Sequence, residues 1–351
     1  MKIAYITGDI APNGNFSLFH DLLGNYPCPN PNWRHRLYLV APTWDRGLVK
    51  HLKDRYIDVR ACFEEFQDST DAYWEKIRQD TEDCDVIISG NITNLDEILP
   101  DSIEIPIVSL SLAEKGYRSP TGGYGSFYKE RFHKTAVSRT AVNAFPEHVR
   151  KHVTPIKSGV DPSRVSPKVT REQLREAWFP ENNSVKLMLF IGAHQDSKKL
   201  SKVVESLNYL PANWYLILLS PPGNFNIPDN LKERVKVCNP TFFVGDIYQA
   251  CDCFVLPTEH EGLSMSLLEA WYLGIPVVTT QHNTIRELQI DHPDVNFGEI
   301  VPIECTPQMI AEAASKAKKS DSAQDCVYKN YMASNMVQRW QKYLQQITGK
   351  E

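Results

Sequence analysis

Short apolar runs alternate with amphipathic segments along most of the chain. The runs have the length and composition of buried strands, and most are bounded by turn residues. Ten of them stand out: KIAYIT, HRLYLVAP, DVIISG, PIVSLSL, KTAVS, KLMLFIG, WYLILLS, RVKVC, CFVLPT and IPVVTT. Helical patterns, such as 200–210 and 263–273, lie between several of them. Apolar strands separated by helices form parallel sheets that are covered on both faces, so the pattern predicts doubly wound α/β layers.

The same pattern predicts two domains. A chain of 351 residues exceeds one ordinary domain. The best boundary is the polar, proline-containing stretch 158–183, which separates two series of strand–helix units. We therefore predict Rossmann-like domains over 1–160 and 161–330, and a final helix over 331–351 that packs back on the N-terminal domain. The apolar residues of that helix recur at helical spacing: Met336, Trp340, Tyr343 and Leu344.

Composition excludes some partners. Apolar residues make up 42% and charged residues 23%, an ordinary globular mixture. The formal net charge of −5 gives no general attraction for nucleic acid, and we predict no such partner. Segment 115–157 differs, because it holds nine basic and two acidic residues, a local balance of 9 − 2 = +7. This segment is either a solvated loop face or a basic surface that meets an anionic acceptor or a membrane periphery.

The eight cysteines show no metal-binding or disulfide framework. No CxxC occurs, and no Cys/His pair has zinc spacing, so we predict no metal. Cys251 and Cys253 share one face of a predicted strand, which favours packing. Free buried thiols are typical of a reducing compartment, and the chain turns acidic at Asp9, too early for a secretory signal. We therefore expect a cytoplasmic protein.

Two glutamates flank a predicted strand-to-helix turn in CFVLPTEHEGLSMSLLEAWYL. Glu261 precedes the helix and Glu269 lies one turn into it. The carboxyl ends of parallel strands and the N-termini of helices bind nucleotides and phosphates, so both glutamates can face a ligand. Alternatively, Ser266 and Glu269 form a capping box in which Glu269 only satisfies a backbone amide. The residues alone leave both interpretations open.

The stretch PTEHEGLSMSLLEAWYLGIPVVTT resembles the E-x7-E signature of retaining glycosyltransferases with the GT-B fold, especially glycosyltransferase family 4. The family form is roughly E-G-F-G-x-x-x-L-E-A-x-x-x-G-x-P-V-V. The matching positions are Glu261, Gly262, Leu268, Glu269, Ala270, Gly274, Pro276, Val277 and Val278. PIKSGVDPSRVSP, FVGDIYQACDCFVLPT and KTAVSRTAV resemble other family segments. The resemblance is good from about 134 to 302 and weak before 130. It implies two doubly wound domains facing each other across a cleft.

The resemblance also implies roles for the residues around the signature. Glu269 would accept hydrogen bonds from the ribose hydroxyls of a nucleotide-sugar donor, and Glu261 would contact hydroxyls of the transferred sugar. The donor's sugar and diphosphate would be held by the backbone amides of four residues: Gly262, Leu263, Ser264 and Met265.

A second resemblance concerns the diphosphate. LFIGAHQDSKKLSKVVESL is similar to the family segment G-R-x-x-x-x-K-G. It places Gly192 at the turn and Lys198 on the lysine that meets the phosphates, with Lys199 as the alternative register. The resemblance thus implies Glu261 and Lys198 as the catalytic residues. We expect Asp196 or Ser197 to cap the following helix, which would place both lysines in its first turn. Cations there oppose the helix dipole by roughly 0.3–1 kcal/mol each, and a bound diphosphate would reverse that sign.

The chain departs from the family at several positions. Ala193 stands where the family has an arginine, and Ser264 where it has a second glycine. The N-terminal loop keeps one glycine, Gly14, which either faces the diphosphate from the opposite domain or serves only as a turn. Ser111 and Leu112 fall where the family frequently has a histidine. Nothing in the sequence ties the histidines present to the site, and we expect ordinary surface or core roles for them: His20, His133 and His282.

The resemblance thus implies a retaining hexosyltransferase. It would move a sugar from a nucleoside-diphosphate donor to an unidentified acceptor hydroxyl, without a metal or other cofactor. A catalytically silent GT-B binding protein, a sugar-nucleotide epimerase and a phosphorylase remain alternatives. A dehydrogenase is disfavoured, because no predicted strand is followed by GxGxxG at the required place.

Overall fold

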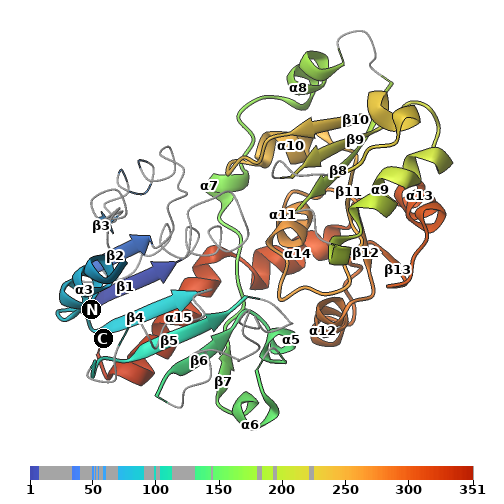
Figure 1. Ribbon diagram of the computed structural model, residues 1–351. Helices are drawn as coiled ribbons and strands as arrows, with labels where there is room; N and C mark the ends of the chain where they lie inside the picture. Colours follow the sequence, from blue (N-terminus) through green and yellow to red (C-terminus); the bar gives the residue numbers. More distant parts are fainter. Residues whose placement is uncertain are drawn as a thin grey trace. The chain divides into compact units, whose positions relative to one another are not determined.

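The computed structural model resolves two α/β units. It describes residues 1–7, 34–39, 50, 52, 54, 58–60, 70–90, 99, 103–112, 131–143, 145–179, 184–192, 196–220 and 225–350. The first unit comprises 1–159 and 333–351, and the second comprises 160–332. Each unit is built on one parallel sheet (Figure 1).

A seven-stranded parallel sheet organises the first unit, in the order β3-β2-β1-β4-β5-β6-β7. The strands are β1 (Lys2–Thr7), β2 (Arg34–Leu39), β3 (Asp58–Arg60), β4 (Val86–Gly90), β5 (Ile107–Ser111), β6 (His133–Ala136) and β7 (Val153–Pro155). The described helices are α3 (Thr70–Thr81), α5 (Arg139–Val142), α6 (Glu147–Arg150) and α15 (Ala333–Thr348). Ile77 of α3 packs with Ala4, Ile6 and Ile87 on one face of the sheet.

A six-stranded parallel sheet organises the second unit, in the order β10-β9-β8-β11-β12-β13. The strands are β8 (Lys186–Ile191), β9 (Trp214–Leu219), β10 (Val235–Cys238), β11 (Cys253–Leu256), β12 (Val277–Thr280) and β13 (Glu299–Val301). The order reverses beside β8, where β9 lies on one side and β11 on the other. Ligands of doubly wound sheets bind at such a switch point, at the carboxyl ends of the strands.

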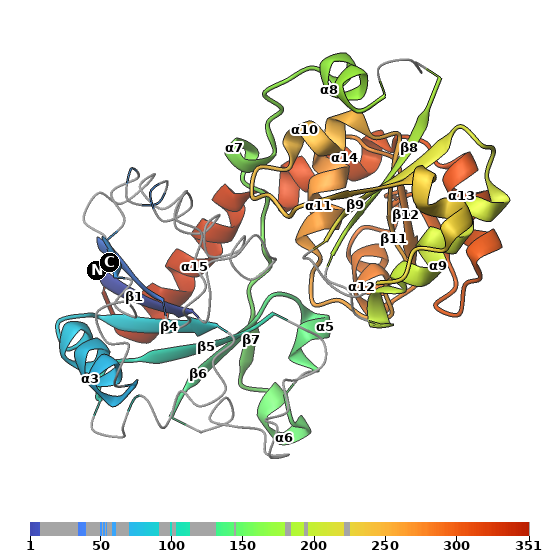
Figure 2. The same ribbon diagram turned by 45° about the horizontal axis from the view of Figure 1, so that its top comes forward.

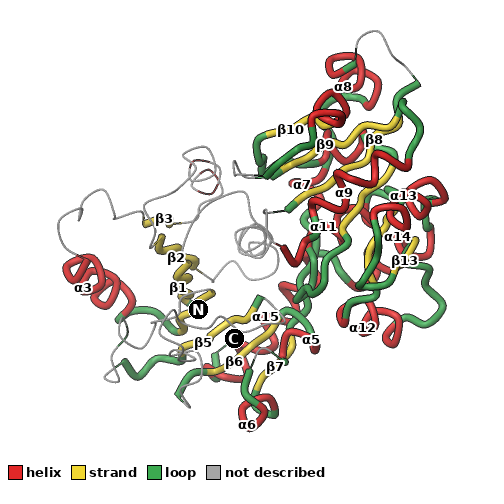
Figure 3. Tube along the Cα trace, turned by 45° about the vertical axis from the view of Figure 1, so that its right-hand side comes forward, coloured by secondary structure: helices red, strands yellow, loops and turns green. Residues whose placement is uncertain are grey.

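Helices cover both faces of this second sheet (Figure 2). They are α7 (Pro162–Val165), α8 (Arg171–Trp178), α9 (Leu200–Ser206), α10 (Gly245–Ala250), α11 (Met265–Tyr272), α12 (Asn283–Asp291), α13 (Pro307–Lys316) and α14 (Asp321–Asn330). Short 3₁₀ turns are η2 (Asp196–Lys198), η3 (Leu207–Tyr209) and η4 (Asp229–Arg234). Helix α9 packs against α13, and α11 packs against α14. Figure 3 shows the resulting alternation of strands and helices along the unit.

All ten apolar runs form strands, as the sequence predicts. Three further strands, β3, β7 and β13, were not predicted. Each has three residues and lies at the edge of its sheet. An edge strand has one neighbour and needs no long apolar run, so these segments carry too little signal to predict.

The predicted C-terminal helix is α15, which lies alongside the first sheet in Figure 1. Its residues group with the first unit. The four apolar residues at helical spacing are all buried, and Trp340 is 1% exposed. Beyond the helix, the ammonium group of Lys350 pairs with Asp85, which precedes β4.

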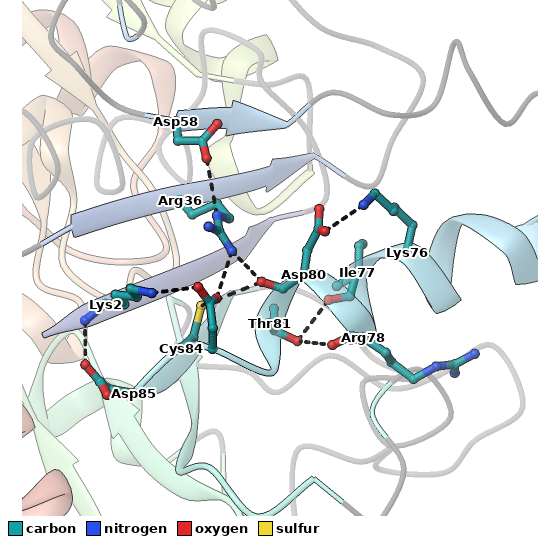
Figure 4. Close-up of polar contacts among 11 residues, drawn as sticks. Lys2, Arg36, Asp58, Lys76, Ile77, Arg78, Asp80, Thr81, Cys84 and Asp85 are labelled. Atoms are coloured by element: carbon teal, nitrogen blue, oxygen red, sulfur yellow. Dashed lines mark hydrogen bonds and ion pairs between the residues drawn. The ribbon is translucent and has the colours of Figure 1, made fainter.

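A charged network closes the amino-terminal edge of the first sheet (Figure 4). Lys2 at the start of β1 pairs with Asp83 at 2.7 Å, and its backbone amide donates to Asp85 at 2.6 Å. Arg36 of β2 pairs with Asp83 at 3.1 Å and with Asp58 of β3 at 3.2 Å. Nucleotide-binding sheets hold their ligands at the opposite, carboxyl edge, so this network is structural.

Part of the basic segment 115–157 is already occupied within the protein. The side chain of Lys134 is buried and donates to the carbonyl of Phe132 at 2.7 Å. Arg150 donates to the carbonyl of Phe145 at 2.8 Å, and Arg131 donates to that of Leu99. Residues 113–130 lie outside the described part of the chain. Among the helices that the structure describes, none is long and apolar enough to cross a membrane.

Asp252 connects helix α8 to the second sheet. Its carboxylate accepts from the Leu187 amide at 2.8 Å, from Arg171 at 2.5 Å and from Arg175 at 3.2 Å. Burial alone would raise the pKa of Asp252, but the Leu187 amide and the two guanidinium groups together hold it below its ordinary value. The carboxylate is therefore stabilised in its charged form.

We predict that Asp252→Asn lowers the free energy of unfolding of the second unit by roughly 1–3 kcal/mol at neutral pH, because hydrogen bonds to a charged group are lost. The folded-state pKa is depressed, so the difference from wild type should shrink as the pH falls through that pKa. Urea unfolding at several pH values measures both effects. The matched control is Asp229→Asn, since Asp229 is 94% exposed and its pair with Lys232 contributes little. Equal effects of the two variants would contradict the prediction.

Candidate functional site

The candidate site lies at the carboxyl edge of the second sheet. Strands β8, β11 and β12 are neighbours, and the chain leaves all three at the same edge because they are parallel. Lys198 follows β8 in η2, and Glu261 follows β11. Two residues that the sequence predicts for donor binding therefore come from adjacent loops at the switch point of the sheet.

Lys198 and Glu261 form an ion pair within this edge. The ammonium group of Lys198 donates to Oε1 of Glu261, and the side chains are 20% and 13% exposed. The Cδ atom of Lys198 lies 4.0 Å from where a Cβ on Gly192 would be. The amide of Gly192 donates to the carbonyl of Leu219 at 3.1 Å, so it continues the sheet. A Cβ at Gly192 would make only ordinary van der Waals contacts, so the lysine side chain does not require a glycine there.

The expected helix start at the two lysines is wrong. Neither Asp196 nor Ser197 caps α9, which begins at Leu200, after both lysines. Lys199 is the N-cap residue and has φ 54°, a left-handed conformation that interrupts the helical path. The lysines therefore precede α9 and do not occupy its first turn.

Lys199 is committed to other partners. Its side chain is buried, its ammonium group donates to the carbonyl of Ile303, and Glu259 lies 3.5 Å away. In the segment G-R-x-x-x-x-K-G, the glycine falls on Lys199 when the motif lysine falls on Lys198. A left-handed φ is the conformation that favours glycine. The backbone thus supports Lys198 over Lys199 as the motif lysine.

The alternative interpretation of Glu269, a capping box with Ser266, does not hold at the start of α11. The N-cap residue is Ser264, whose hydroxyl accepts from the amide of Leu267 at 3.4 Å. Ser266 lies inside the helix, and the Glu269 carboxylate contacts Arg164 rather than its own helix start. The helix begins two residues earlier than a cap at Ser266 would require. Glu269 is therefore held by tertiary contacts.

Arg164, Tyr248 and Glu269 form a buried cluster between α7, α10 and α11. Arg164 donates to Oε1 of Glu269, and the hydroxyl of Tyr248 lies 3.2 Å from Oε2. The two charged side chains are 3% and 4% exposed. Helix α7 is close to α10, because a Cβ on Gly245 would lie 2.2 Å from the carbonyl oxygen of Val165. This close approach places Arg164 within reach of Glu269.

Backbone contacts join the three loops of the site. The amide of Glu259 donates to the carbonyl of Ser197 at 2.8 Å, which links the loop after β11 to η2. The hydroxyl of Thr284 in α12 donates to the carbonyls of Glu261 at 2.5 Å and Gly262 at 3.1 Å. The loops that carry Lys198 and Glu261 and the start of α12 are thus held together.

His282 belongs to this group, whereas the sequence analysis expected an ordinary surface or core role for it. It follows β12 and is the N-cap residue of α12, two positions before Thr284. Burial lowers its pKa to about 4; the charge of Glu261 acts in the opposite direction, while Lys198 and His260 lower it further. These effects place the ring within the field of the ion pair. Its position at the carboxyl end of a predicted strand was the signal available in the sequence.

Several predicted positions give no further geometry. Gly14, Ala193 and His20 lie outside the described residues. Ser111 ends β5 and is buried. Within the described ranges, no group of three or more His, Cys, Asp or Glu side chains has an arrangement that would hold a metal ion.

Comparison with solved structures establishes the class of fold. The chain resembles Anabaena HepE, solved in complex with UDP-glucose, with a TM-score of 0.77, 17% identity and coverage of 99% of this chain and 100% of that one. It also resembles a glycosyltransferase from Rickettsia africae, with a TM-score of 0.74, 13% identity and coverage of 99% of each chain. Identities this low show the fold alone. The predicted GT-B fold, with two Rossmann-like domains, is confirmed.

Comparison with protein families and curated sequences finds similarity mainly in the second unit. Residues 185–319 match the family described as "Glycosyl transferases group 1". One curated relative is the UDP-Gal:alpha-D-GlcNAc-diphosphoundecaprenol alpha-1,3-galactosyltransferase of Escherichia coli, 21% identical over 56% of this chain and 55% of that protein. Another is the mannosylfructose-phosphate synthase of Agrobacterium fabrum, 29% identical over 38% of this chain and 33% of that protein. The match thus spans about half of the first relative and a third of the second.

We predict that Arg164→Met destabilises the second unit by roughly 3–5 kcal/mol, because it leaves the Glu269 carboxylate buried without its cation. The double variant Arg164→Met/Glu269→Gln should recover part of this loss, since no unpaired charge remains. Denaturant unfolding of the two single variants and the double variant measures the coupling.

The matched control is Arg286→Met, because Arg286 is exposed on α12. It should change the free energy of unfolding little. Additive effects of the substitutions at 164 and 269 would show that the buried pair does not couple α7 to α11.

Proposed function

We propose that the protein is a retaining glycosyltransferase of family 4 type, which transfers a hexose from a nucleoside-diphosphate sugar to an acceptor hydroxyl. One observation carries the proposal: Lys198 and Glu261 are paired at the switch point of the second sheet. An ammonium group binds phosphate oxygens, and a carboxylate accepts from sugar hydroxyls. A nucleotide sugar presents these two kinds of group next to each other, so it can replace both partners of the ion pair.

The comparisons favour a uridine nucleotide as the first donor to test. The name of the E. coli relative contains UDP-Gal, and HepE was solved with UDP-glucose. We propose a UDP-hexose for this chain on that basis.

Glu269 is proposed to bind the donor's ribose. A carboxylate has about four lone-pair sites. Arg164 occupies one, and the Tyr248 hydroxyl, which donates to the carbonyl of Ser266 at 2.8 Å, lies 3.2 Å from Oε2. The remaining sites can accept the ribose hydroxyls at the small exposed edge of the side chain. In this arrangement Arg164 fixes the carboxylate and keeps it charged. The backbone amides from Gly262 to Met265, at the start of α11, are proposed to hold the sugar and the diphosphate.

The proposed reaction breaks the bond between the sugar's anomeric carbon and the diphosphate. Negative charge grows on the leaving diphosphate, and the positive charge of Lys198 stabilises it in the transition state. The acceptor oxygen attacks from the face that the diphosphate leaves, so the anomeric configuration is retained, and the diphosphate takes the acceptor's proton. This route uses a lysine as its cation and requires no metal or other cofactor. The six described cysteines are free, which suits the proposed cytoplasmic location.

A silent binding protein is the second candidate. Two features favour it: Lys198 and Glu261 already neutralise each other, and Ala193 stands at the family's arginine position. Such a protein would bind a nucleotide sugar without hydrolysis or transfer. A phosphorylase would instead require free phosphate as a second substrate. Product analysis with and without phosphate separates these functions.

We predict that Lys198→Met weakens the binding of UDP and of UDP-glucose and lowers turnover by roughly 10²–10³-fold, because a charge that stabilises the leaving group is removed. Glu261→Gln should behave differently. It frees Lys198 and so should leave UDP affinity equal or higher, while UDP-glucose loses hydrogen bonds to a charged group. Titration calorimetry and thermal shift with UDP-, GDP- and ADP-glucose measure binding, since a ligand of the folded state raises the melting temperature.

Lys202→Met is the matched control. Lys202 lies in α9 and donates to the carbonyl of Cys305 at 3.0 Å, outside the ion pair. It should leave both affinities near wild type. If none of the three nucleotide sugars binds the wild-type protein, the proposed function is wrong.

A further inference from the structure

His282 is a buried polar side chain without a hydrogen-bond partner. Its exposed fraction is 0%, and within the described part of the chain neither Nδ1 nor Nε2 has a partner. The residue begins α12 but does not cap it with its side chain. A buried polar group left unsatisfied costs free energy, and most such groups in native structures have partners. The missing partner therefore calls for an explanation.

The surroundings of His282 supply one. Glu261, Lys198 and His260 are the charged or titratable groups that act on the ring. Because burial lowers the pKa of His282 to about 4, the imidazole is neutral at neutral pH. A neutral imidazole carries one N–H donor and one acceptor nitrogen. Among the residues that the structure describes, the N–H of His282 has no acceptor. The carboxylate of Glu261 is a hydrogen-bond acceptor and can serve as its partner.

The Glu261 carboxylate pairs with Lys198 and not with His282. Lys198 donates to Oε1 of Glu261, and neither ring nitrogen of His282 has a hydrogen bond to that carboxylate. Under the proposed function, the diphosphate draws Lys198 away, and the partly buried carboxylate then loses its cation. The hydroxyl of Thr284 bonds to the carbonyls of Glu261 and Gly262, so the start of α12 and the glutamate loop stay together when the lysine moves. His282, the N-cap residue of α12, therefore stays next to the loop that carries this carboxylate.

We propose that His282 is a positioning residue for Glu261: when the nucleotide sugar takes Lys198, the imidazole donates its N–H to the Glu261 carboxylate and fixes it for the sugar hydroxyls. The inference rests on the proposed function. It assigns His282 to recognition of the sugar and excludes it from recognition of the diphosphate. A histidine that only fills space in the core would affect neither.

The test compares matched ligands that differ only in the sugar: UDP and UDP-glucose, GDP and GDP-glucose, ADP and ADP-glucose. For the pair that binds wild type, His282→Leu should leave the Kd of the nucleoside diphosphate within about twofold. The Kd of the nucleotide sugar should rise about tenfold or more, the loss expected for one hydrogen bond to a charged group. Titration calorimetry measures both.

Two conservative variants identify the nitrogen that acts. His282→Asn keeps an N–H near the position of Nδ1, and His282→Gln keeps one near Nε2. One of them should restore most of the sugar-dependent affinity, and this holds even if His282→Leu folds poorly. His292→Leu is the control, because His292 lies at the other end of α12 and contacts the hydroxyl of Tyr331 at 3.0 Å. It should leave the ratio of the two Kd values unchanged.

Two results would overturn the inference alone. In the first, His282→Leu keeps both affinities, and its melting temperature is equal or higher, as expected for a packing residue. In the second, all variants at 282 weaken both ligands equally. Failure of wild type to bind any of the six ligands is a different result, since it refutes the proposed function and the inference together.

Discussion

The ion pair between Lys198 and Glu261 is the interaction on which the site depends. Two opposite charges are held in a partly buried place, where each would be costly alone because it has lost water. The pairing offsets that cost only while both partners remain. A ligand that satisfies both partners offers an anion to the lysine and hydrogen-bond donors to the carboxylate. A nucleoside diphosphate offers only the anion, so its binding leaves Glu261 without its cation, and a sugar alone leaves Lys198 paired and in place. A nucleotide sugar meets both demands at once.

The two glutamates of the signature have different environments, although the sequence presents them as a pair. Glu261 lies in a loop with one exchangeable partner, whereas Glu269 lies in α11 and is enclosed by Arg164 and Tyr248. The first can change its partner when a ligand binds. The second is fixed, and its cation comes from the segment that begins the unit, so an intact connection between α7 and α11 is a condition for placing its carboxylate. The signature therefore combines a partly buried contact in a loop with a fully buried contact in a helix.

Sequence reasoning succeeded where the interior of the fold dictates the residue pattern. Strands β8, β11 and β12 are buried along most of their length, and an apolar run is the direct consequence of that burial. It failed where a single neighbouring strand or side chain determines the local structure. The edge strand β13 has three residues, and the N-cap of α11 depends on which of two serines lies at the turn. Only the tertiary position of Arg164 distinguishes a capping glutamate from one held by a distant cation.

The neighbouring lysines show how a local conformation selects a functional side chain. Lys199 adopts a left-handed backbone, which costs an L-residue roughly 1–2 kcal/mol, and its ammonium group is held by Ile303 and Glu259. That backbone ends η2 and gives the two adjacent side chains different partners. If the ammonium group of Lys199 moved to a ligand, the Ile303 carbonyl and Glu259 would lose their partner in a buried place. If the ammonium group of Lys198 moved to a ligand, only the Glu261 carboxylate would lose its partner. Under the proposal, the sugar hydroxyls and His282 replace that partner. The lysine that can move is thus the one whose partner has a substitute.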